Sequence, residues 1–145
     1  MEVNGIAHIF LTASNFERSR EFYRKLLPFL GLKPVIDTDR TYYCVGGRTA
    51  VGISAPSPEH AGAAFEQNRV GLHHLCFRAR ERADIDELFG FLCSLGAKII
   101  RAPRARINGR RVIIRCCSRI PTASGWSSIM CRVRACWREV CCGGI

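Results

Sequence analysis

Two histidines occur at the same place in two copies of one sequence pattern. His8 lies in the segment 5–13 and His74 in the segment 71–79, so the copies are offset by 66 residues. Each histidine follows a glycine by three residues and precedes an alanine by five. Imidazole nitrogens are common ligands of zinc and other transition metals. If the two copies fold alike and pair, both imidazoles lie on facing strands, which predicts half of a metal site.

Other polar side chains near these strands are weaker candidates for functional residues. His73 points to the opposite face from His74, because side chains alternate along a strand. A lone histidine on an apolar strand is more often a hydrogen-bonded core residue, and this alternative stays open for His8 and His74. Tyr43 and Arg48 could line a cleft, but a solvent-exposed hairpin is the favoured interpretation. The pattern assigns no catalytic residue.

The elements that position His8 begin with a strand predicted over residues 6–13. Both faces of this strand are largely apolar, so we expect both faces to be covered. One face carries His8, Phe10 and Thr12, and the other carries Ile9, Leu11 and Ala13. Ser14 and Glu17 have the spacing of a capping box and predict a helix with Ser14 as its N-cap. The buried positions of this helix are Phe16, Ser19, Tyr23, Leu26 and Leu27, and it stops near Gly31.

The remaining elements complete the first copy and begin the second. Short strands are predicted over 33–36, 41–45 and 49–54, so module one, residues 4–55, has the order βαβββ. A linker follows over 56–69. Module two, residues 70–103, repeats the start of the pattern. Its predicted elements are a strand over 70–79, a helix over 82–95 that Gly96 ends, and a strand over 97–101.

Composition changes abruptly near Pro103. A chain of 145 residues, of which 48% are hydrophobic, is long enough for one domain with a real core, and no apolar run is long enough to span a membrane. The formal net charge is +10, but residues 104–145 hold nine arginines, one acidic residue and no lysine. The same tail contains six of the nine cysteines. The two parts therefore need separate interpretations.

Residues 4–103 resemble the glyoxalase, bleomycin-resistance and extradiol-dioxygenase proteins, the vicinal-oxygen-chelate superfamily. The resemblance implies one α+β domain over residues 1–145, built of paired βαβββ modules that enclose a cleft, with module two incomplete after about residue 104. The residues that carry it are Ile6-Ala7-His8-Ile9, Phe16-Glu17-Arg18-Ser19, Phe22-Tyr23, Leu30-Gly31-Leu32 and Leu72-His73-His74-Leu75-Cys76-Phe77.

The same resemblance implies a function. In the family a divalent metal in the cleft chelates two neighbouring oxygens of a small-molecule substrate. His8 and His74 match two of its ligands, and the metal would be zinc, nickel, manganese or iron. A third ligand, usually glutamate, comes from the last strand of module two. Some members take a fourth from the last strand of module one, where residues 51–54 offer neither an acid nor an amide.

We therefore expect the intact protein to be a metal-dependent enzyme and a homodimer. Its reaction would be that of a lyase or isomerase, such as a lactoylglutathione-lyase-like enzyme, or of a dioxygenase. The alternative is a metal-free protein of the bleomycin-resistance type, which binds a drug or another small ligand. The glutamate that would be the third metal ligand distinguishes the enzyme from the metal-free binding protein. Because the chain as printed lacks that glutamate, we expect it to bind metal weakly or not at all.

The tail departs from the family pattern in a way that predicts a frameshift near residues 104–110. The codons of residues 111–118 can be chosen so that reading them one base out of phase gives Gly-Tyr-Tyr-Ser-Val-Leu-Phe-Glu. Those of residues 119–127 can be chosen to give Asp-Pro-Asp-Gly-Ile-Arg-Leu-Glu, the turn and final strand that module two lacks. The last glutamate straddles Trp126 and Ser127. A surplus of arginine and cysteine without lysine also suits an out-of-frame reading of GC-rich DNA.

Other interpretations of the tail have less support. Its arginines form no helical face and are not interleaved with aromatic residues, so we expect no nucleic-acid partner. The pairs Cys116-Cys117 and Cys141-Cys142 are adjacent rather than spaced as zinc ligands are. With no signal peptide visible we expect a cytoplasmic protein with reduced cysteines and no membrane partner. Within the tail, only residues 112–114 are expected to pair as a strand.

Overall fold

The computed structural model describes most of residues 1–103 and short strands beyond them. The described residues are 1–3, 5–61, 63, 70–71, 75–77, 79–103, 105–108, 111–114, 117–122, 125–127 and 131–133. His73 and His74 lie outside them. The chain forms two compact units, Met1–Phe65 with Ile120–Ser127, and Glu66–Arg119 with Ser128–Ile145.

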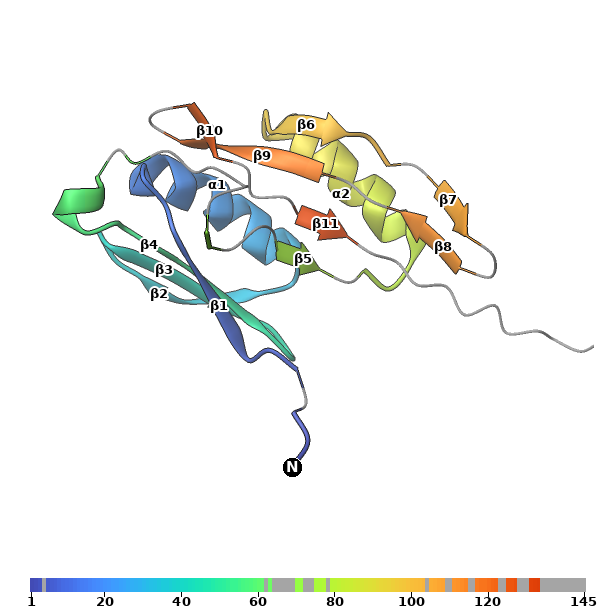
Figure 1. The fold of residues 1–145 in the computed structure, drawn as a ribbon, viewed down its shortest axis with the longest axis horizontal. Helices are drawn as coiled ribbons and strands as arrows, with labels where there is room; N and C mark the ends of the chain where they lie inside the picture. Colours follow the sequence, from blue (N-terminus) through green and yellow to red (C-terminus); the bar gives the residue numbers. More distant parts are fainter. Residues whose placement is uncertain are drawn as a thin grey trace, which may run out of the picture. The chain divides into compact units, whose positions relative to one another are not determined.

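The first unit contains a four-stranded sheet in the order β1-β4-β3-β2 (Figure 1). Its elements in chain order are β1 (His8–Thr12), α1 (Phe16–Phe29), β2 (Lys33–Asp37), β3 (Thr41–Val45) and β4 (Ala50–Ser54). Strands β2, β3 and β4 form an antiparallel meander, and β1 joins β4 in parallel. A parallel neighbour needs a long crossover connection, and here α1 and the meander supply it. The predicted βαβββ order of module one is confirmed.

Helix α1 begins one residue later than the sequence pattern predicted. The N-cap is Asn15, whose side-chain oxygen accepts a hydrogen bond from the backbone N–H of Arg18 at 3.0 Å. The predicted capping box between Ser14 and Glu17 is therefore wrong. Asparagine and serine are equally good N-caps, so two adjacent candidates leave the choice to the path of the chain. At the other end Gly31, with φ +81°, follows the helix and ends it as predicted.

The core of the first unit lies between α1 and one face of the sheet. Helix α1 contacts β2, β3 and β4. It buries Phe16, Ser19, Phe22, Tyr23, Leu26 and Leu27. The sheet residues that are buried on the helix side are Leu11, Tyr42, Cys44, Val51 and Ile53. Every helix position predicted to be buried is buried, because the 3.6-residue spacing of apolar side chains defines one face of a helix.

The second unit contains the start of the repeated pattern. It includes β5 (Leu75–Phe77), α2 (Arg82–Ser94) and β6 (Lys98–Arg101). Helix α2 has a capping box between Glu81 and Asp84, ends at a C-cap followed by Gly96 with φ +68°, and contacts β6. Its buried residues are Ile85, Leu88 and Leu92. No helix in the described parts of either unit is long and apolar enough to cross a membrane.

The tail forms more strands than the sequence predicted. They are β7 (Ala105–Asn108), β8 (Arg111–Ile114), β9 (Cys117–Thr122), β10 (Gly125–Ser127) and β11 (Cys131–Val133). Strand β8 pairs with β7, β9 pairs with both β6 and β10, and β11 pairs in parallel with β5. The expectation of pairing at residues 112–114 alone is therefore too narrow. Strand pairing uses backbone N–H and C=O groups, which every residue of the tail except proline carries whatever its side chain.

Candidate functional site

The face of the first sheet opposite α1 carries the candidate histidine. We call it the His8 face, and it comprises the outward residues of β1, β4 and β3. In register across these strands they are His8, Ala50 and Val45; Phe10, Gly52 and Tyr43; and Thr12, Ser54 and Thr41. His8 and Thr12 are exposed, and Phe10 is 49% exposed. The expectation that both faces of β1 are covered is therefore wrong for this face.

The side chain of His8 is exposed and lies beside an aromatic ring. Its imidazole meets the ring of Phe10 edge-on, with centroids 5.9 Å apart and planes at 82°. An exposed imidazole can accept or donate a proton and can bind a metal. The core alternative, a buried and hydrogen-bonded histidine, does not describe His8. His74 lies outside the described residues, so its pairing with His8 stays a prediction.

Phe10 and Tyr43 form a stacked pair next to His8. Their ring centroids are 5.3 Å apart and their planes differ by 7°. The two residues flank Gly52 in the register of β1, β4 and β3. Tyr43 is half-buried, whereas Arg48 is exposed in the turn before β4. Of the two residues that were candidates for lining a cleft, Tyr43 therefore belongs to the His8 face.

Gly52 is the residue of this face that the sequence interpretation missed. A Cβ atom at this position would lie 2.4 to 2.6 Å from three ring atoms of Phe10. The Phe10 ring thus lies directly on the backbone of β4, and only glycine leaves room for it. The signal in the sequence was a lone glycine inside a strand pattern, which often marks a close approach.

The row beyond the aromatic pair carries three hydroxyl residues, Thr12, Ser54 and Thr41. Thr12 Oγ1 and Ser54 Oγ are 3.4 Å apart, at the outer limit of a hydrogen bond. Each hydroxyl can donate and accept. The His8 face therefore carries, in adjacent rows, an imidazole, two stacked rings and three aliphatic hydroxyls.

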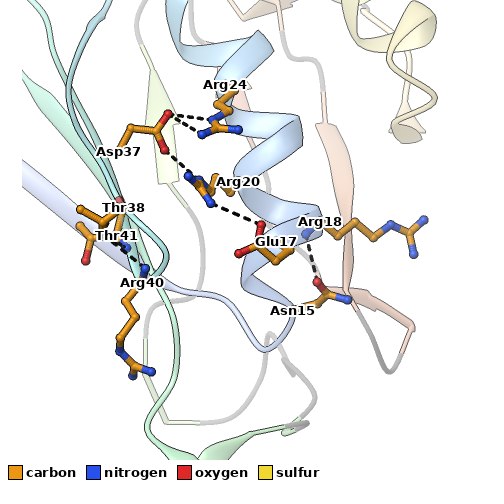
Figure 2. A network of polar contacts seen from close by, with 9 residues as sticks. All are labelled: Asn15, Glu17, Arg18, Arg20, Arg24, Asp37, Thr38, Arg40 and Thr41. Atoms are coloured by element: carbon orange, nitrogen blue, oxygen red, sulfur yellow. Dashed lines mark hydrogen bonds and ion pairs between the residues drawn. The ribbon is translucent and has the colours of Figure 1, made fainter.

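A polar network lies on the other side of the sheet (Figure 2). Asp37, at the end of β2, aligns with the buried Tyr42, and its carboxylate binds Arg20 Nε at 2.8 Å and Arg24 Nη2 at 2.7 Å. Arg20 also contacts Glu17 at 3.4 Å. Desolvation alone would raise the pKa of Asp37, but the hydrogen bonds and charges of Arg24 and Arg20 outweigh it and lower the pKa below 3.8. This network joins α1 to β2 and is separate from the His8 face.

The buried thiol and phenol of β3 belong to the core. Burial, with Cys44 and Asp37 beside it, raises the pKa of Tyr42 well above its ordinary value. Burial also raises the pKa of the Cys44 thiol. Because the thiolate is the reactive form, a buried thiol with a raised pKa is a poor nucleophile. Cys44 is thus a packing residue.

The described residues do not by themselves make a metal centre. No cluster of three or more His, Cys, Asp or Glu side chains suited to a metal occurs among them. On the His8 face, His8 is the one side chain of these four types. Three protein ligands are usual even for a catalytic zinc with an open position. The fold family's metal therefore does not fit the described residues alone.

Comparisons with known proteins agree with this architecture. A family model described as the Glyoxalase/Bleomycin resistance protein/Dioxygenase superfamily matches residues 5–126. No curated protein matches the chain.

Solved structures show the same fold. A candidate glyoxalase from Bacillus halodurans has a TM-score of 0.70 at 21% identity, with 91% of this chain and 96% of that chain covered. A glyoxalase/bleomycin resistance protein from Albidiferax ferrireducens T118 has a TM-score of 0.66 at 20% identity, with coverages of 91% and 98%. A lactoylglutathione lyase from Agrobacterium tumefaciens has a TM-score of 0.56 at 20% identity, with coverages of 94% and 95%.

Proposed function

Because the chain belongs to the Glyoxalase/Bleomycin resistance protein/Dioxygenase superfamily, we propose that its intact form is a metal-dependent enzyme that acts on a small molecule. The reaction would be a lyase or isomerase reaction, or a dioxygenation. The repeated histidine carries the proposal, because His8 and His74 stand at one position of a duplicated sequence pattern. The exposure of His8 supports it, since a ligand must reach open space.

The proposed ligand set is His8, His74 and a glutamate that this reading of the gene does not contain. The glutamate would come from the adjacent reading frame near Trp126. Tryptophan has the single codon TGG, so its last base followed by the AG of a serine codon spells GAG, a glutamate codon. One shift near residues 104–110 recovers about sixteen consecutive family-like residues from residue 111 onward.

The same shifted reading also resembles a strand of module one. In module one, β3 reads Thr-Tyr-Tyr-Cys-Val over Thr41–Val45. The shifted reading of residues 111–115 permits Gly-Tyr-Tyr-Ser-Val, which places two tyrosines and a valine where module two should have its equivalent strand. We therefore propose that the chain as printed is an impaired form whose tail is read out of frame.

Sequencing of genomic DNA and of complementary DNA across codons 100–130 tests the frameshift directly. The expected result is one inserted or deleted base, relative to the nucleotide sequence that encodes the printed chain, which brings the glutamate codon into frame. An intact-protein mass that matches the printed sequence, with the same reading in both nucleic acids, would exclude it for the native protein.

Metal analysis tests the ligand set. We expect the frame-restored chain to bind one equivalent of divalent metal and the printed chain to bind little, because two imidazoles rarely hold such an ion alone. His8→Ala and His74→Ala should each abolish binding in the restored chain. His60→Ala is the matched control, because His60 is exposed in the 3₁₀ turn Pro58–His60. A restored chain whose metal content ignores both alanine changes would refute the assignment.

A metal-free binding protein is the second candidate function. It is favoured by the stack of the exposed Phe10 ring on the half-buried Tyr43 ring, which resembles a surface for holding a ligand rather than for activating one. Binding of a small molecule by the printed chain in the presence of a chelator would support it.

We also propose a cytoplasmic homodimer, and sedimentation velocity of the restored chain tests its oligomeric state.

A further inference from the structure

Strand β5 of the second unit is the counterpart of β1 in the repeat. The offset of 66 residues places Leu75 at the position of Ile9 and Phe77 at the position of Leu11. In the first unit β1 is completed by β4, which pairs with it in parallel. A strand edge with free N–H and C=O groups pairs readily with another strand. If the two copies fold alike, β5 needs a parallel partner at the same edge.

Strand β11 is this partner in the printed chain. It pairs in parallel with β5 and lies beside it in Figure 1. Leu75 aligns with Cys131, and its counterpart Ile9 aligns with Val51 of β4. In both pairs a helix and further strands separate the two partners along the chain, as a parallel connection requires. Strand β11 therefore stands to β5 as β4 stands to β1.

Strand β10, where the restored reading would have its glutamate, has a different partner. Trp126 and Ser127 belong to β10, which pairs antiparallel with β9. Among the strands that the structure describes, β11 alone pairs with β5. The segment around Trp126 is therefore not at the edge of β5 in the printed chain.

An additional hairpin lengthens the route from β5 to its partner. In the first unit, β2, β3 and β4 follow the helix, whereas β6 to β11 follow helix α2. Strands β7 and β8 pair with each other and with no other described strand. They use up chain without extending the pairing of β5 or β6, so a segment further along the chain reaches β5.

We propose that β11 is a substitute for the fourth strand of module two. It occupies the edge of β5 that corresponds to the edge of β1 covered by β4, and it keeps the segment around Trp126 away from that edge. Pairing through backbone groups tolerates the altered sequence, and the valine at position 133 favours a strand. The inference goes beyond the proposed function, because it concerns the fold of the printed chain and holds with or without metal. The printed chain is then a folded protein whose defect lies in its ligand set.

The register of β11 on β5 can be measured in the unaltered chain. Arg132 and Cys76 are aligned in the pair, so we expect nuclear Overhauser effects between their backbone protons. Effects between β5 and residues 125–127 in their place would overturn the proposal. A register displaced by one or two residues would also overturn it, because the correspondence with β1 and β4 would be lost.

Hydrogen exchange followed by NMR tests whether β11 protects β5. In the full chain, the triple variant Cys131→Gly, Arg132→Pro and Val133→Gly should disrupt β11, because proline lacks an N–H group and glycine disfavours a strand. The β5 amides that bond to β11 should then exchange faster by about tenfold or more. The amides of β1 should keep their protection, since β4 remains in place.

A second triple variant is the matched control. Cys136→Gly, Trp137→Pro and Arg138→Gly make the same kind of change outside the described strands, and exchange at β5 should stay as in the unaltered chain. Unchanged exchange at β5 in the β11 variant, with β1 still protected, would refute the inference. If the β11 variant loses protection at β1 as well, it has unfolded, and the backbone contacts measured in the unaltered chain decide between the outcomes.

Discussion

Replacing Leu27 by alanine tests how strongly α1 supports the sheet that carries His8. Leu27 is 0% exposed and lies on the face of α1 that covers the sheet. The change removes three carbon atoms, and about 0.8 kcal/mol per buried methylene gives roughly 2.4 kcal/mol of lost transfer free energy. The cavity that remains adds to this, so we expect the free energy of unfolding to fall by about 2–5 kcal/mol.

Urea unfolding followed by far-ultraviolet circular dichroism measures this loss. The transition midpoint should fall while the slope m stays the same, since the surface exposed on unfolding hardly changes. Lys25→Ala is the control on the same helix, because Lys25 is exposed and its removal should matter by less than about 0.5 kcal/mol. A loss below about 1 kcal/mol for Leu27→Ala, or an equal loss in the control, would refute the assigned core.

Four further substitutions test local features. Asp37→Asn should remove a stabilisation that is present above the ordinary carboxyl pKa of 3.8 and is lost as pH falls through the lowered pKa of Asp37; urea unfolding curves of the two proteins should therefore differ at neutral pH and converge in acid. Asn15→Ala should cost about 1 kcal/mol in unfolding free energy, because the Arg18 N–H loses its cap. Gly90→Ala should raise the melting temperature, since the added Cβ meets nothing within 4 Å and alanine favours a helix by about 0.5–1 kcal/mol. Gly31→Ala should lower it because of the positive φ.

The local elements of module one could be predicted because their signals are local. Turn residues separate the strands, and the apolar spacing of α1 predicted all of its buried residues except Phe22. The N-cap was missed by one residue, since Ser14 and Asn15 are both good caps. The exposure of the His8 face was missed because apolar residues on both faces of a strand do not tell which face another element will cover.

The sequence by itself determined that His8, Phe10 and Thr12 share one face of a strand, because side chains alternate with a period of two. It also determined the duplicated pattern and the βαβββ order. Only the tertiary structure decided that Phe10 lies on Gly52 beside Tyr43, and that Asp37 binds Arg20 and Arg24. Gly52 and Tyr43 are more than ten residues from Phe10 in the chain, as Arg20 and Arg24 are from Asp37, so strand register and the packing of α1 bring them together. The lone glycine in β4 signals a close approach, but the sequence does not tell which ring makes it.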